Sequence, residues 1–131
     1  MRKLIIEQTT YSPKVILDHE KNLFEISGES KPPDVAAFYL NIIRWFDDYS
    51  EHLDRSQSTG HPGVLNFDFQ YFNTSSAKYI LDLCKKIGDV RSKGINLEIK
   101  WHYEEDDPDM LEAGREMSKL AKFPFEFVQK N

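Results

Sequence analysis

The chain has 131 residues, of which 40% are hydrophobic and 30% charged, and its formal net charge is −5. This length suits a single hydrophobic core, so we predict one domain over residues 1–131. The acidic balance without a run of Lys and Arg argues against nucleic-acid binding, and no window is apolar for the ~18 residues of a membrane span, so we expect a cytoplasmic protein that binds neither.

Three short strands are predicted near the N-terminus, at residues 3–7, 14–18 and 22–27, with a turn at His19–Asn22 between the last two. The segment GESKPPD, Gly28–Asp34, then interrupts the pattern. Apolar residues recur three and four positions apart from Val35 to Leu53. This spacing predicts a long amphipathic helix over residues 34–53.

The second half of the chain alternates between strand and helix patterns after a polar loop at residues 54–63. Residues 64–72 and 95–103 alternate apolar and polar side chains, and this period of two predicts two strands. Between them, the apolar stripe from Ala77 to Ile87 predicts a helix that ends at Gly88 or at Lys93–Gly94. A third helix is predicted over residues 110–121 and a last strand over residues 123–128.

The order of these elements predicts an α/β domain with two layers, in which helices lie mainly on one face of a mixed, mostly parallel sheet. Parallel strands covered on both faces are usually apolar throughout, whereas the two strands with the clearest alternation have a polar side. We expect that side to be solvated in preference to binding a partner. It carries Asn66, Asp68, Gln70, Glu98, Lys100 and His102.

The stretch YFNTSSAK, Tyr71–Lys78, joins a predicted strand directly to a predicted helix. Its Asn, Thr and Ser side chains can accept hydrogen bonds from the free N–H groups of a first helical turn, so capping alone accounts for them. A phosphate on an exposed hydroxyl at this place would meet the same N–H groups and the positive end of the helix dipole, and Lys78 could reach it. Both interpretations are open at this point.

Five carboxylates occur within six residues, at Glu104, Glu105, Asp106, Asp107 and Asp109. Such oxygens suit Mg²⁺ or Ca²⁺, but the run lacks the spacing and the central Gly of a calcium loop. Helix capping by Asp107, with Pro108 at the first helical position, is the stronger interpretation. We therefore predict no metal site, although the five carboxylates could form an acidic docking patch for a basic partner.

Other chemical signatures are weak. Cys84 falls on the apolar stripe of its helix, which favours a buried structural thiol. The four His residues lack metal-ligand spacing, and the chain has neither a Gly-rich phosphate loop nor a Gly-x-Ser-x-Gly turn, so we expect no nucleotide-binding enzyme and no cofactor. Two alternatives stay open: a small metal-assisted enzyme that uses the acidic residues 104–109 and His102, and a constitutive scaffold domain.

Several segments resemble the SiaC family of bacterial regulatory phosphoproteins, over roughly residues 9–128. The most specific are YFNTSSAK and WHYEEDDPDMLEAG, and TTYSPKVILD, FEISGES and FYLNIIRWFDDY agree with them. The resemblance implies a fold similar to STAS domains and anti-sigma factor antagonists. It also implies a non-enzymatic role in a partner-switching pathway.

Members of such pathways are phosphorylated by a Ser/Thr protein kinase and dephosphorylated by a PP2C-like phosphatase. The unphosphorylated form engages an effector, which in this family is associated with diguanylate cyclase control and biofilm behaviour. The family's phosphoacceptor is the threonine of the NTSS motif, here Thr74, with Ser75 as the alternative because related antagonists place a serine nearly there. Asn73, Ser75, Ser76 and Lys78 would then neighbour the phosphate and form the docking surface.

Overall fold

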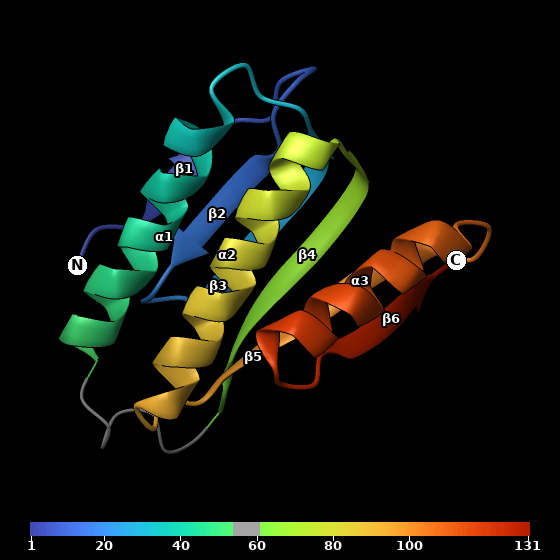
Figure 1. Cartoon of the computed structure of the whole chain (residues 1–131). Coiled ribbons are helices and arrows are strands. Elements are labelled where there is room, and N and C mark those ends of the chain that lie inside the picture. Colours follow the sequence, from blue (N-terminus) through green and yellow to red (C-terminus); the bar gives the residue numbers. More distant parts are fainter. Residues whose placement is uncertain (54–60) are drawn as a thin grey trace.

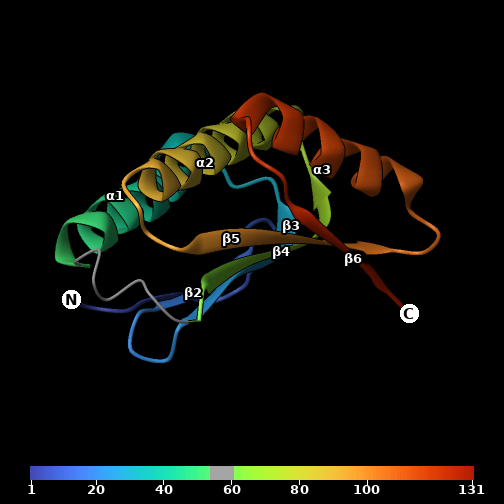
Figure 2. The same ribbon diagram turned by 90° about the horizontal axis from the view of Figure 1, so that it is seen from below.

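Six strands form one sheet in the residues that the structure describes, and three helices cover one face of this sheet (Figures 1 and 2). The computed structural model describes residues 1–53 and 61–131, so most of the loop predicted at residues 54–63 lies outside the described residues. The strands are β1 (Leu4–Ile6), β2 (Lys14–Asp18), β3 (Leu23–Ser30), β4 (Gly63–Phe72), β5 (Leu97–Glu104) and β6 (Glu126–Lys130). The helices are α1 (Val35–His52), α2 (Thr74–Ser92) and α3 (Pro108–Ala121).

The sheet changes from antiparallel to parallel pairing at β3. The strands lie in chain order; β1, β2 and β3 pair antiparallel, and β3, β4, β5 and β6 pair parallel. Each parallel pair needs a crossover, which here is a helix. Because successive parallel strands are added in one direction and crossovers have a fixed hand, α1, α2 and α3 fall on the same face. The predicted two-layer α/β architecture is confirmed (Figure 2).

The hydrophobic core lies between the sheet and the three helices. Its largest fully buried side chains come from α1 and from the central strands, and they include Phe24, Tyr39, Phe46, Phe67 and Trp101. Cys84 is fully buried as predicted, and burial raises the pKa of its thiol. Within residues 1–53 and 61–131, no helix combines the length and the apolar character that crossing a bilayer demands.

A β-bulge near the end of β4 changes which side chains face the helices. The register with β3 shifts by one residue, so Gln70 has no pairing partner in β3. The extra residue reverses the alternation beyond Phe69. Tyr71, which the period-two pattern places on the apolar side, is 48% exposed, and Phe72 packs on Phe69 with ring centroids 5.5 Å apart.

Most element ends lie within three residues of the predicted ones. β3 continues through Gly28 to Ser30, because Gly28 adopts a φ of +112° that glycine tolerates. α2 ends at Ser92 with Lys93 as its C-cap, which is the second of the two predicted ends. The last strand begins at Glu126, since the segment before it is held by Ser118, whose hydroxyl donates to Phe123 O and accepts from Phe125 N–H.

Two glycines inside helices give a matched test of the packing. A Cβ atom on Gly114 of α3 would stand 2.5 Å from Cδ1 of the buried Trp101. We expect Gly114→Ala to lower the free energy of unfolding by about 1–3 kcal/mol, because the indole must move. On Gly88 of α2 the nearest atoms are 3.5 Å away, so Gly88→Ala should leave stability unchanged or raise it by up to ~1 kcal/mol. Urea denaturation measures both, and equal stabilities would contradict this account.

Candidate functional site

One backbone carbonyl holds the junction between β4 and α2. Ser30 O, at the end of β3, accepts hydrogen bonds from Asn73 N–H at 3.0 Å and from the Ser76 hydroxyl at 3.0 Å. Asn73 is the N-cap of α2, since its side-chain oxygen accepts from Ser76 N–H at 2.9 Å. The capping interpretation is therefore confirmed, with Asn73 as the capping residue.

A chain of three buried hydroxyl groups lies beneath this cap, on Tyr39 of α1, Ser30 of β3 and Ser76 of α2. Ser30 Oγ donates to Ser76 Oγ at 2.9 Å, and Ser76 Oγ donates to Ser30 O. Because the Ser30 hydroxyl has a single proton, the 2.5 Å bond between Tyr39 Oη and Ser30 Oγ is donated by Tyr39. Burial raises the pKa of the Tyr39 phenol, which keeps this donor protonated.

The three consecutive hydroxyl residues at the start of α2 differ in accessibility. The side chain of Ser76 is fully buried, whereas Thr74 and Ser75 are exposed. Ser76 therefore anchors the helix from inside, and the expectation that it belongs to an exposed docking surface is wrong. The signal that could have revealed this is helical spacing, because Ser76 lies one turn before the buried Ile80.

Helix geometry places Thr74 on the side of α2 that faces α3. Residues of an α-helix advance by about 100° each, so Thr74, Leu81 and Gly88, seven residues apart, lie in one row along the helix. A side chain on Gly88 would meet Ala121 and Phe123 at the C-terminal end of α3. The row that begins at Thr74 thus lines the boundary between α2 and α3.

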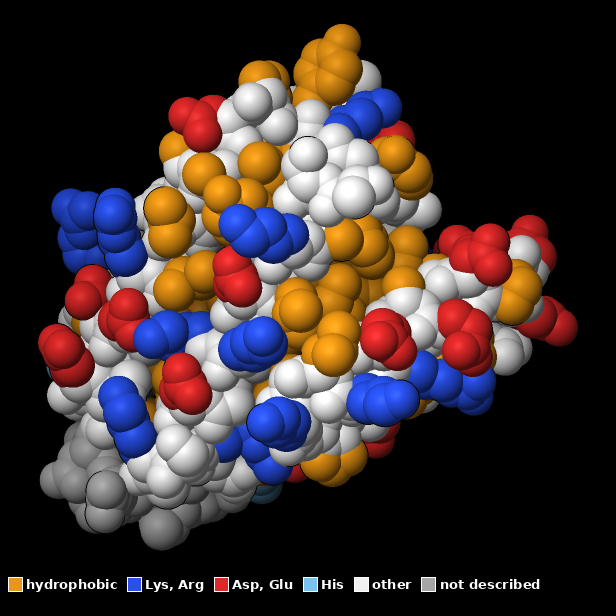
Figure 3. All heavy atoms as spheres, in the orientation of Figure 1, with side chains coloured by type: hydrophobic (Ala, Val, Ile, Leu, Met, Phe, Trp, Pro, Cys, Tyr) orange, Lys and Arg blue, Asp and Glu red, His pale blue; other side chains and the backbone are white. Residues whose placement is uncertain are grey.

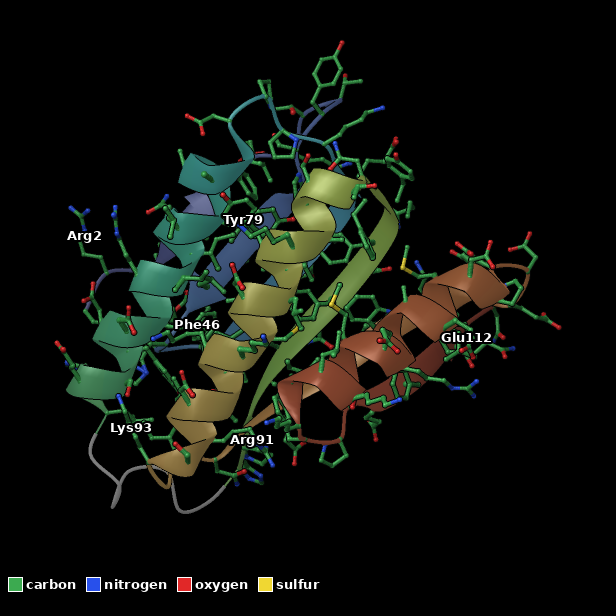
Figure 4. All side chains as sticks on the ribbon, in the orientation of Figure 1. Arg2, Phe46, Tyr79, Arg91, Lys93 and Glu112 are labelled. Atoms are coloured by element: carbon green, nitrogen blue, oxygen red, sulfur yellow. The ribbon has the colours of Figure 1, made fainter. Side chains whose placement is uncertain are left out.

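Ser75 lies about 100° around α2 from Thr74, on the side toward α1. It shares a helical row with Tyr79 and Lys86. Figure 4 shows Tyr79 on the side of α2 toward α1. The Tyr79 ring stacks with Tyr39 of α1 at 6.5 Å between centroids, and Lys86 Nζ pairs with Asp47 of α1 at 2.7 Å. The two exposed hydroxyls therefore face different neighbours.

Lys78 follows Thr74 by one turn and is also exposed. Its Nζ lies 5.1 Å from the centroid of the Tyr79 ring, which is a cation–π contact. In the part of the chain that the structure describes, no backbone carbonyl accepts from the N–H groups of Thr74 and Ser75. The start of α2 therefore combines two free amide donors, one ammonium group and one exposed threonine hydroxyl.

The acidic run at residues 104–109 contributes to the start of α3 and to one ion pair. Asp107 caps α3 by accepting from Met110 N–H at 3.1 Å, and Pro108 is its first residue, as predicted. Glu104 pairs with Lys130 at 3.2 Å. Glu105, Asp106 and Asp109 are exposed. Within the described ranges, no group of three or more His, Cys, Asp and Glu side chains is arranged to hold a metal ion.

Polar side chains on the face of the sheet without helices form pairs with one another. His102 Nε2 lies 2.9 Å from Asn66 Oδ1, and burial lowers the pKa of His102. Lys130 Nζ lies 2.6 Å from Asp68 Oδ1. Sequence alternation indicated the face of these side chains but not their partners, because pairs that join different strands leave no local pattern. The pairing agrees with the predicted solvated face.

Removal of the buried hydroxyl on Ser76 tests the anchor. We expect Ser76→Ala to lower the free energy of unfolding by about 1–3 kcal/mol, because the hydroxyl of Ser30 and its carbonyl oxygen each lose a buried partner. Ser75→Ala is the matched control and should stay within about 0.5 kcal/mol of the parent, since its side chain is exposed. Urea denaturation compares the three proteins. Similar losses in the two variants would refute an internal role for Ser76.

A family model and one curated relative match most of this chain. The family model for SiaC family regulatory phosphoproteins matches residues 6–130. An uncharacterized protein of Pseudomonas aeruginosa is 24% identical over 125 residues, which cover 95% of this chain and 94% of the relative.

Two solved structures from Pseudomonas aeruginosa have the same fold. Apo-SiaC is similar with a TM-score of 0.81 and 22% identity over 100% of both chains. A chain in the crystal structure of diguanylate cyclase SiaD in complex with its activator SiaC is similar with a TM-score of 0.85 and 22% identity, over 97% of this chain and 99% of that one. Together with the family match over residues 6–130, the likeness leads to one conclusion: this chain belongs to the SiaC family of regulatory phosphoproteins.

Proposed function

We propose that this chain is a non-enzymatic regulator of a diguanylate cyclase and that phosphorylation of Thr74 controls the interaction. The family match supports the regulatory role, and SiaC of Pseudomonas aeruginosa is the activator of the diguanylate cyclase SiaD. The observation that carries the choice of residue is the contrast between the exposed Thr74 and the fully buried Ser76 in the same motif.

A phosphate on Thr74 would be compatible with the fold. It carries a charge of roughly −1.5 to −2 and would lie beside the free N–H groups of Thr74 and Ser75, within reach of Lys78. The helix dipole would stabilise this charge by about 0.3–1 kcal/mol. The phosphate would therefore affect the binding of a partner, because a partner that covers this site must desolvate the dianion.

Three kinds of partner follow from this role. A Ser/Thr protein kinase adds the phosphate, a PP2C-like phosphatase removes it, and the cyclase binds the unmodified form, all in the cytoplasm. This sequence of events is partner switching. The acidic residues 104–109 are engaged in capping and ion pairing at two positions, Asp107 and Glu104, which favours regulation over a metal-assisted reaction.

Phosphorylation of purified protein tests the choice of hydroxyl. We expect incubation with ATP and a cognate Ser/Thr protein kinase to add one phosphate, mapped to Thr74 by fragment mass spectrometry. Thr74→Ala should abolish the modification, and Ser75→Ala should retain it because Ser75 faces α1 instead of α3. Phosphate found on Ser75 in the parent protein would show that the assignment is wrong.

Binding to the purified cyclase tests the switch. We expect Thr74→Ala to bind as the parent does and stoichiometrically phosphorylated protein to bind at least about tenfold more weakly, because a dianion must lose its water at the contact. Thr74→Asp should weaken binding less, since its single charge imitates a phosphate poorly. Isothermal titration measures the affinities. Equal affinities for all forms would instead identify a constitutive scaffold.

A further inference from the structure

A strip of apolar side chains lies between α2 and α3, and Figure 3 shows hydrophobic side chains gathered there. This α2–α3 strip consists of Ala77 and Leu81 from α2 and Ala113 and Leu120 from α3. Three of these side chains are half-buried, and Leu120 is 43% exposed. Where the two helices converge, a cavity of about 550 Å³ opens between Leu120 and Gly88.

The strip rests on a rigid aromatic layer. Phe72, at the end of β4, is half-buried and lies 6.2 Å from the centroid of Trp101. Trp101 is fully buried against Gly114 of α3, and its Nε1 donates to Met110 O at 2.9 Å. A partner that binds here would therefore meet a preformed surface, which lowers the ordering cost of association.

The two walls of the strip differ in charge. On α3, Asp109, Ala113, Glu116 and Leu120 follow one another at steps of four, three and four residues, so they form one helical row. Leu120 lines the cavity with α2, which identifies this row as the wall toward α2. Asp109 and Glu116 are exposed and form no ion pair within the described residues. The outer edge of α2 alternates Lys78, Asp82, Lys85 and Asp89 and carries no net charge.

We propose that the α2–α3 strip is the docking site for one amphipathic helix of the cyclase, with Lys or Arg along the flank that faces α3. This proposal rests on the proposed function. A helix satisfies its own backbone groups, so it can lie on an apolar strip that offers no free sheet edge. From Ala77 to Gly88, which lines the cavity, the strip and the cavity together extend about 16 Å along α2. This length matches about three turns of a partner helix with apolar anchors at positions i, i+3 or i+4, and i+7.

This docking mode explains why Thr74 controls binding. Thr74 begins the helical row that continues through Leu81 and Gly88, so its hydroxyl stands at one end of the strip. A phosphate there would have to lose water beneath an apolar helix face. The basic flank of the partner helix lies on the other side, along α3, and offers no compensating charge.

Two leucines with nearly equal exposure give a matched test. Leu120, in the strip, is 43% exposed, and Leu40, on α1, is 40% exposed. For the purified cyclase, we expect Leu120→Glu to weaken binding at least about tenfold and Leu40→Glu to change it less than about twofold. Circular dichroism and urea denaturation verify that both variants fold as the parent does.

The outcomes separate this proposal from the function on which it rests. If the parent binds the cyclase and the two variants lose affinity equally, the docking site is elsewhere and the regulatory function stands. If the parent does not bind the cyclase, both are overturned. If Leu120→Glu changes only the oligomeric state in sedimentation equilibrium and leaves cyclase affinity unchanged, a second copy of the chain occupies the strip and the proposal is wrong.

Charge reversal on the α3 wall tests the basic flank of the partner. We expect Glu116→Lys to weaken binding about threefold or more at low salt and less at high salt, because screening reduces the effect of an exposed charge. Glu51→Lys, an exposed position on α1, is the control and should leave binding unchanged. Equal responses of the two variants, or tighter binding by Glu116→Lys, would overturn the assigned polarity.

Discussion

The carbonyl group of Ser30 is the contact on which the junction between β4 and α2 depends. It accepts from the backbone of Asn73 and from the side chain of Ser76, and so joins the end of β3 to the start of α2. The hydroxyl of the same residue connects Ser76 to Tyr39 of α1. Because these groups are buried, any displacement of the helix start would leave polar atoms without partners at a cost of about 1–3 kcal/mol each. The position of Thr74 is therefore set by buried hydrogen bonds that Thr74 itself does not make.

The one-sided arrangement of the helices has a chemical consequence for both faces of the sheet. The side with helices is filled by aromatic and aliphatic side chains, whereas the other side is closed by pairs such as Asp68 with Lys130 and His102 with Asn66. A partner that binds through apolar contacts would therefore bind to the helical layer. Within that layer α2 is joined to α1 by an ion pair, and it converges with α3 at their C-terminal ends, where Gly88 lies near Ala121 (Figure 1).

The sequence predicted the layers and the order of elements because periodicity is a local property. Alternation identified β4 and β5, and spacings of three and four identified α1 and α3. The bulge at Gln70 was missed, since an extra residue in a strand shows only against its neighbour, and it reversed the orientation predicted for Tyr71. The capping role of Asp107 was predictable from residue type and the burial of Ser76 from helical spacing, but the buried hydroxyl chain joins Ser76 to Ser30 and Tyr39, which are 46 and 37 positions away in the chain. Long-range hydrogen bonds of this kind leave no trace in a single sequence.

The short segment from Gln70 to Ser76 works as a fixed-length spacer. The bulge sets the phase of the strand at one end, and the buried serine sets the phase of the helix at the other. Insertion or loss of one residue between them would turn the helix start by about 100° and exchange which hydroxyl is sealed and which is open. Insertions and deletions should therefore be tolerated far better in surface loops than in these seven positions, where they would exchange an exposed hydroxyl for a buried one.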